Sequence, residues 1–239
     1  MSNSWFQFKQ FRIEQGKTAM KVGTDGVLLG AWVDVNNAQN ILDIGTGTGL
    51  IALMLAQRNS KAQIIGVELE EEASRQAEVN FRNSSWNDRL NVVNEGIQQF
   101  SKTYHQKFDV IVSNPPFFIN SFASEDKKRQ TARHTDSLSF EDLLDAVKLL
   151  LTNTGDFSVI LPSEQGGSFI GKANRRGLYM YKQLDIYPTD SSQIAKRVLL
   201  SFTKEEKEQV FESLVIEPQQ RHQYSEAYMA LTKDFYLKF

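Results

Sequence analysis

Apolar and polar positions follow two alternating patterns along the chain. Short apolar runs, which are typical of buried strands, occupy residues 40–44, 62–68, 90–93, 108–112 and 157–161. Longer segments between them repeat apolar side chains at helical spacing, and these segments cover residues 50–58, 70–84 and 139–152. Because strands that alternate with helices form parallel sheets covered on both faces, we predict a doubly wound α/β fold.

The pattern changes after residue 161. A helix interrupted by glycines is predicted over residues 165–176, and further strands over residues 183–187, 197–202 and 212–216. Strands that follow one another without helices favour antiparallel pairing. We therefore predict an antiparallel C-terminal edge on a mostly parallel sheet. Residues 1–39 are expected to form an N-terminal extension to a core over residues 40–239.

Length and composition favour one globular domain over residues 1–239. The chain is 41% hydrophobic and 23% charged, and no apolar run approaches the roughly 20 residues that span a bilayer. The N-terminus lacks the residue order of a signal peptide, and no cysteine is present for a disulfide or a thiolate metal site. We expect a cytoplasmic monomer without a metal. With a net charge of −2, any surface for nucleic acid must be a local patch.

A glycine-rich loop follows the first strand of the core. It reads Asp43-Ile44-Gly45-Thr46-Gly47-Thr48-Gly49, at the place where α/β folds bind nucleotides. Glycine lets the backbone approach a ligand closely, and Glu68 at the end of the second strand can accept hydrogen bonds from ribose hydroxyls. The G-x-G-x-G spacing departs from the G-x-G-x-x-G of dinucleotide sites. We interpret the loop as a nucleoside site; the alternative is a tight connection without a ligand.

The strand over residues 108–112 is followed by Ser113-Asn114-Pro115-Pro116-Phe117-Phe118. Two prolines fix two φ angles, which holds their carbonyls in set directions. The Asn114 side-chain oxygen and the Pro115 carbonyl can accept both N–H groups of an exocyclic amine, whose nitrogen then turns its lone pair toward an electrophilic methyl group. Phe117 is expected to stack on the base. The alternative is a rigid loop packed by Phe117 and Phe118.

The glycine loop resembles the first motif of class I S-adenosylmethionine-dependent methyltransferases, and Asn114 to Phe117 match the amino-methyltransferase motif (D/N/S)-P-P-(Y/F/W). Over nearly the whole chain, the sequence is similar to the bacterial tRNA1(Val) (adenine(37)-N6)-methyltransferase family. The similarity rests on blocks at residues 8–11, 19–32, 43–49, 114–118, 132–134 and 231–237. The resemblance implies a Rossmann-like class I methyltransferase fold with a seven-stranded sheet, S-adenosyl-L-methionine as cofactor, and adenine 37 of a valine tRNA as substrate.

The resemblance also implies roles for individual residues. Residues 21–26 are expected to fold over the cofactor; the alternative is a capped turn that leads into a helix. The implied cofactor-binding residues are Lys21, Thr24, Asp25, Gly26, Asp43, Gly45, Thr46, Gly47, Gly49, Glu68, Leu69, Glu95, Gly96 and Asn114. The implied catalytic residues are Asn114, Pro115, Pro116 and Phe117. The implied substrate-binding residues are Phe117, Phe118, Lys127, Lys128, Arg129, Arg133 and His134.

Other substrates share the Asn-Pro-Pro-Phe motif, so alternatives stay open. Guanine N2 of rRNA and glutamine N5 of a protein are the nearest, although enzymes for these usually carry a larger N-terminal domain than residues 1–39 can supply. A sensor or RNA chaperone that keeps the cofactor pocket is a further alternative. Lys172, Arg175 and Arg176 are interpreted as solvated charges rather than phosphate contacts.

Overall fold

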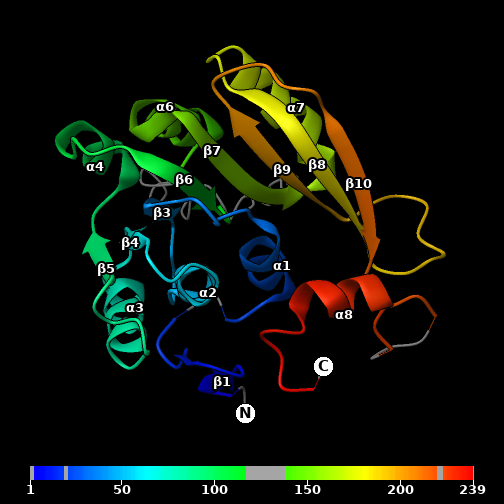
Figure 1. Cartoon of the computed structure of the whole chain (residues 1–239), viewed down its shortest axis with the longest axis horizontal. Helices are drawn as coiled ribbons and strands as arrows, with labels where there is room; N and C mark the ends of the chain where they lie inside the picture. The colour runs from blue at the N-terminus through cyan, green and yellow to red at the C-terminus, as the bar shows by residue number, and fades with distance from the viewer. Residues whose placement is uncertain (1–2, 19–20, 117–137, 220–222, 239) are drawn as a thin grey trace, which may run out of the picture.

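The computed structural model describes residues 3–18, 21–116, 138–219 and 223–238. Helices cover both faces of a large central sheet (Figure 1). The strands of this sheet are β3 (Asn40–Ile44), β4 (Gln63–Glu68), β5 (Leu90–Asn94), β6 (Phe108–Ser113), β7 (Leu151–Pro162), β8 (Tyr179–Tyr187), β9 (Arg197–Thr203) and β10 (Val210–Val215). The predicted α/β fold is confirmed.

The described part of the sheet has eight strands in the order β10-β8-β9-β7-β6-β3-β4-β5, one more than the seven that the resemblance implied. Strands β3 to β7 pair in parallel, and β9 runs antiparallel to both of its neighbours, β7 and β8. β10 pairs in parallel with β8. Among the described strands of this sheet, the antiparallel direction is therefore confined to β9. This strand lies between β7 and β8, which run parallel to each other.

Each face of the sheet carries its own hydrophobic core. Helices α1 (Thr24–Trp32), α2 (Leu50–Arg58) and α3 (Glu71–Arg82) cover one face, and α4 (Ile97–Thr103), α6 (Phe140–Leu150) and α7 (Ser163–Asn174) cover the other (Figure 1). On β3, Ile41 belongs to the first core and Leu42 to the second. Strands that are buried on both faces have continuous apolar runs. This burial explains why the sequence pattern predicted these strands.

Two of these helices show why their segments fold as predicted. Every residue of α2 from Leu50 to Ala56 is buried, so the apolar run 50–56 reads as a helix enclosed by neighbours. Ser139 caps α6, where its hydroxyl oxygen accepts a hydrogen bond from the Asp142 amide at 3.0 Å. The predicted helix over residues 139–152 ends at Leu150, and β7 begins at Leu151. The pairing of β7 with β6 is irregular there. The sequence pattern therefore predicted the strand only from residue 157.

The N-terminal residues contribute more than an extension. α1 packs on α2 so closely that a Cβ on Gly30 would stand 2.8 Å from Met54 Sδ, so a larger residue there would require Met54 to shift. Strands β1 (Trp5–Gln7) and β2 (Arg12–Glu14) form a hairpin. The Lys9 amide donates to the Phe235 carbonyl at 2.8 Å, just after α8 (Glu226–Thr232). The segments near the two ends of the chain thus lie side by side, at the bottom of the view in Figure 1.

Candidate active site

The glycine loop makes the turn from β3 to α2 with three left-handed residues. Gly45, Gly47 and Gly49 have φ angles of 71°, 56° and 82°. A Cβ on Gly49 would lie 2.4 Å from the Phe81 ring, whereas Cβ atoms on Gly45 and Gly47 would meet nothing within 4 Å. Gly49 is therefore required by the α3 packing, and Gly45 and Gly47 leave open space over the loop for a ligand.

Glu68 fastens the loop to the end of β4. Its Oε2 accepts a hydrogen bond from the Gly47 amide at 2.8 Å, and its Oε1 accepts one from the Glu70 amide at 2.9 Å. A carboxylate has about four acceptor sites, so the side chain keeps capacity for ribose hydroxyls. The structure thus brings two predicted cofactor residues together.

Asp43 lies fully buried beneath the loop. Its Oδ2 accepts hydrogen bonds from Thr46 Oγ1 at 2.6 Å and from the Ala52 amide at 3.3 Å, which joins β3 to α2. Its Oδ1 is buried without a hydrogen-bond partner among the described residues. Burial raises the pKa of Asp43 to about 7, against the opposing effect of the Thr46 hydrogen bond.

Asn114 follows β6 directly, next to the end of β3. The Ser113 hydroxyl donates to the Ile44 carbonyl at 2.9 Å, which joins the two strand ends. Asn114 Oδ1 is buried and has no hydrogen-bond partner in the described part of the chain. A buried acceptor without a donor is costly unless a ligand supplies one. The Asn114 oxygen, at the strand end next to the glycine loop, fits a site that receives a polar donor from a bound group.

Residues 21–26 lie in different environments, from exposed to buried. Thr24 begins α1 after Gly23, an N-cap without a side-chain hydrogen bond, and Gly26 is buried against Leu50 at the start of α2. The Asp25 carboxylate accepts a hydrogen bond from Arg197 Nε at 2.7 Å. Lys21 is exposed, and its ammonium lies 3.4 Å from the Asn3 carbonyl. Sequence reasoning missed Arg197, since 172 positions separate it from Asp25.

The residues after β5 lie beside the end of β4. The Glu95 amide donates to the Glu68 carbonyl at 3.0 Å, and Gly96 is the N-cap of α4. The Asn94 side-chain amide donates to the carbonyls of Glu68 and Leu69 at 2.9 and 3.0 Å. Leu69 is 52% exposed and flanks Gly96. The Asn94 side chain thus orients the backbone that follows β4, a role that sequence reasoning did not predict.

The predicted substrate-binding residues follow Pro116 in the sequence. Phe117, Phe118, Lys127, Lys128, Arg129, Arg133 and His134 lie outside the described residues. Pro115 is buried and Pro116 exposed. Lys172 and Arg176 form ion pairs with Glu141 and Asp145 on α6, and only 25% and 20% of their side chains are exposed. They are therefore paired rather than solvated, which corrects the interpretation drawn from the sequence.

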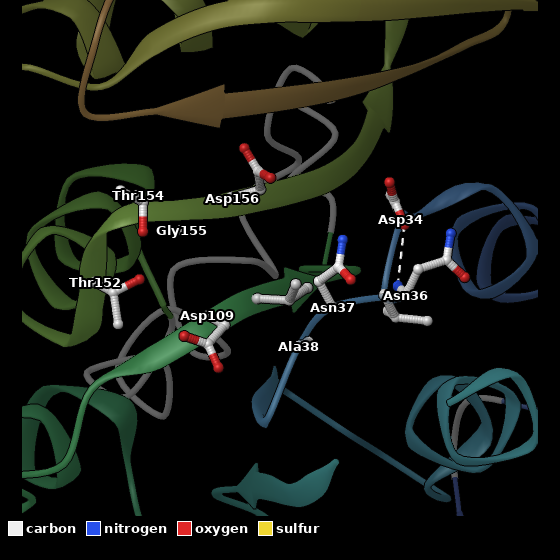
Figure 2. Close-up of a pocket in the computed structure, with 11 residues that line it drawn as sticks. Asp34, Asn36, Asn37, Ala38, Asp109, Thr152, Thr154, Gly155 and Asp156 are labelled. Carbon is white, nitrogen blue, oxygen red and sulfur yellow. Dashed lines mark hydrogen bonds between the residues drawn. The ribbon is translucent and has the colours of Figure 1, made fainter. Parts of the chain in front are cut away.

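A separate small pocket lies at the amino ends of β3 and β6, on the side of the sheet away from the glycine loop; Figure 2 shows its lining residues. It has a volume of about 210 Å³, and its carboxylates are Asp34, Asp109 and Asp156. Asp109 Oδ2 accepts from the Gln39 and Asn40 amides at 2.9 and 3.0 Å, which fixes the amino ends of β6 and β3 together. Burial raises the pKa of Asp156. Over the described ranges, no group of three or more His, Cys, Asp or Glu residues could hold a metal ion, and no helix is long and apolar enough to cross a membrane.

The fold and the loop together define a class I S-adenosylmethionine-dependent methyltransferase, and S-adenosylmethionine is the cofactor of this class. Residues 18–167 match the family model of the methyltransferase small domain. This chain belongs to the tRNA1(Val) (adenine(37)-N6)-methyltransferase family.

The evidence for the family comes from relatives that match over the full length. Proteins of this name from Flavobacterium psychrophilum and Phocaeicola vulgatus are 48% and 49% identical to this chain, over 98% and 99% of it and 99% of each relative. A predicted O-methyltransferase from Agrobacterium tumefaciens has a similar structure, with a TM-score of 0.70 over 88% of this chain and 96% of that one. Its 20% identity supports the fold alone.

Proposed function

We propose that this chain transfers a methyl group from S-adenosylmethionine to N6 of adenine 37 in tRNA1(Val). The observation that carries the proposal is the buried Asn114 oxygen without a donor, at the strand end next to the glycine loop. An exocyclic amine offers the donor that this oxygen lacks. The full-length similarity to relatives that bear this name supports adenine as the base and tRNA as its carrier.

We assign the cofactor to the open space over Gly45 and Gly47. Glu68 would accept hydrogen bonds from its ribose, and Leu69, Glu95 and Gly96 would border its adenine. Asp43 and Thr46 hold the loop in shape through their hydrogen bond. Thr24, Asp25 and Gly26 act at the start of α1, where the Asp25 pair with Arg197 sets the position of the first turn.

When bound, S-adenosylmethionine supplies a methyl group on a sulfonium, which is a good leaving group. Asn114 Oδ1 and the Pro115 carbonyl would accept hydrogen bonds from the two N6–H groups, so the N6 lone pair is withdrawn from the ring and turned toward the methyl carbon. As the C–N bond forms, the electrons of the broken S–C bond stay on the sulfur, and the methylated N6 loses one proton to water. The proline ring at Pro115 and its neighbour Pro116 keep this carbonyl in a set direction. Catalysis then consists of positioning and fixed hydrogen bonds, and the base must leave its stack to reach the site.

The remaining residue assignments follow from the same chemistry. Phe117 and Phe118 would stack on the flipped adenine. Lys127, Lys128, Arg129, Arg133 and His134 would contact phosphates. We propose further that residues 1–239 act as one methyltransferase domain, in monomeric form and in the cytoplasm, where tRNA is present.

The test is to incubate the purified chain with labelled S-adenosylmethionine and unmodified tRNA, digest the tRNA to nucleosides and identify the product by mass spectrometry. We expect N6-methyladenosine at position 37 of tRNA1(Val). A tRNA whose adenine 37 is replaced by guanine is the matched control and should stay unlabelled. Methylguanosine as the product, or label only in protein, would contradict the proposal.

A further inference from the structure

A further concave surface lies at the carboxyl ends of the strands, the same side of the sheet that carries Asn114. We call it the aromatic groove and define it by the lining side chains of Trp5, Phe6, Tyr224, Tyr228 and Tyr236. Its volume is about 770 Å³, which is within the range of sites for small molecules. The five rings that define the groove have no role in the proposed reaction.

The strand directions place the groove on the substrate side. Pro188 and Ile216 line it, and they directly follow β8 and β10. These strands run in the same direction as β7 and β6, so their carboxyl ends share the edge that carries Asn114. Gly23 and Thr24 line the groove at the start of α1, so the groove continues from the segment beside the glycine loop. Figure 1 shows α8 next to α1 at this end of the molecule.

Aromatic rings line the groove, and three of them are tyrosines that carry hydroxyl groups. Tyr224 and Tyr228 stack with centroids 5.2 Å apart, and the Tyr228 hydroxyl donates to the Tyr236 hydroxyl at 3.4 Å. Phe6 meets the Tyr236 ring edge to face at 6.3 Å. Trp5 also lines the groove and is 44% exposed. Flat rings bind any nucleobase by stacking, and hydroxyls can bond to base edges.

Lysines that can contact a phosphate backbone border the groove, next to one acidic lining residue, Glu217. Lys238 lines the groove and is exposed. The exposed Lys21 ammonium lies 3.4 Å from the carbonyl of Asn3, another lining residue. The guanidinium of Arg12 lies 4.3 Å from the centre of the Trp5 ring and forms an ion pair with Glu14 at 2.7 Å, so it covers one face of Trp5 and its charge is partly balanced. An aromatic floor with cations at its border is the combination used for unpaired RNA.

We propose that the aromatic groove binds an unpaired nucleobase of the tRNA anticodon loop, other than adenine 37, by stacking on Tyr224 and Trp5. This proposal rests on the proposed function, because it takes the tRNA as the occupant. A base held there fixes the loop against the edge of the sheet while adenine 37 enters the site at Asn114.

The test uses the full chain with unmodified tRNA1(Val) and measures the Kd for tRNA, KM, kcat and the Kd for S-adenosylmethionine. Tyr224→Ala and Trp5→Ala should each raise the Kd and KM for tRNA by about tenfold, as expected for the loss of one stacked base. They should leave kcat and the cofactor Kd unchanged. Tyr224→Phe keeps the ring and should bind tRNA like the wild type. Phe211→Ala is the matched control, since Phe211 is 62% exposed on β10 and does not line the groove.

Crosslinking gives a readout that loss of stability would not mimic. tRNA with 4-thiouridine in its loop should crosslink to peptides that contain Trp5 or Tyr224. Crosslinks elsewhere only, or tRNA affinity unchanged in folded Trp5→Ala protein, would overturn the groove proposal while wild-type methylation of tRNA still stands. Wild-type protein that methylates no tRNA would overturn the proposed function, and the groove proposal with it.

Discussion

The carboxylate of Asp25 accepts a hydrogen bond from Arg197 Nε at 2.7 Å, which joins the first turn of α1 to the first residue of β9. Both side chains are partly exposed, at 24% for Asp25 and 34% for Arg197. The pair joins an N-terminal helix to a C-terminal strand at the edge of the sheet where the substrate must approach.

Asp25→Asn should lower the free energy of unfolding by no more than about 1 kcal/mol, because partly exposed ion pairs contribute little. The larger effect is expected on positioning, as a rise in KM for S-adenosylmethionine at nearly constant kcat. A double-mutant cycle with Arg197→Gln separates the pair from other contacts. Additive effects on KM would contradict the positioning role.

Glu68→Gln should weaken S-adenosylmethionine binding by about tenfold or more, because a neutral amide replaces a charged acceptor of the Gly47 amide and of ribose hydroxyls. Isothermal titration calorimetry measures this Kd. Glu70→Gln, an exposed acid two residues away, is the matched control and should bind like the wild type. Equal Kd values for all three proteins would remove Glu68 from the cofactor site.

Asp43 should make the stability of the ligand-free protein depend on pH. Its pKa is about 7 in the folded chain and 3.8 without the burial. Between these values the folded state keeps a proton that the unfolded chain has lost, so the free energy of unfolding falls as the pH rises from about 4 to about 7. Asp43→Asn removes this contribution, and its stability relative to the wild type should rise over that window by on the order of 4 kcal/mol.

Urea denaturation at several pH values between about 4 and 8 checks this difference. Asp88→Asn, at an exposed acid, controls for the loss of one carboxylate and should follow the wild-type curve. A constant difference between wild type and Asp43→Asn at every pH would show that Asp43 does not hold the extra proton.

Gly49→Ala should destabilise the protein by about 2 to 4 kcal/mol, since the new Cβ adds left-handed strain to an overpacked contact. That Cβ would stand 2.4 Å from the Phe81 ring at a φ of 82°. Thermal unfolding measures the loss. Gly167→Ala in α7, where a Cβ meets nothing within 4 Å, is the control and should stabilise by about 0.5 to 1 kcal/mol. Similar melting temperatures for Gly49→Ala and wild type would contradict the packing of α3 on the loop.

The predicted elements succeeded where burial was continuous. The strand over residues 40–44 and the helix over residues 50–58 have the predicted bounds, because both are enclosed by neighbours. The extension expected over residues 1–39 contains α1, which was not predicted because Gly26 and Gly30 are typical of turns in a local pattern. In the folded chain they lie close to α2, where a Cβ would stand 3.0 Å from Leu50 and 2.8 Å from Met54. The parallel pairing of β10 with β8 depends on the place of β9 in the sheet, which a local pattern does not encode.

The candidate site was predictable to the extent that it is local. The Asp43 to Gly49 loop and Asn114 could be found because spacing and position in the fold define them. The Arg197 partner of Asp25 and the lining of the aromatic groove come from segments distant in sequence. Only the folded chain brings these segments together.

The measurement that tests the central claim most directly compares wild-type and Asn114→Ala protein on unmodified tRNA1(Val). The single-turnover rate of N6-methyladenosine formation and the Kd for S-adenosylmethionine are determined for both. The loss of one hydrogen-bond acceptor for the reacting amine should slow methyl transfer by about 100- to 1,000-fold and change the cofactor Kd by less than about threefold. A variant that methylates adenine 37 at the wild-type rate, or one that fails mainly because it no longer binds the cofactor, would contradict the role of Asn114 as the group that holds the amine.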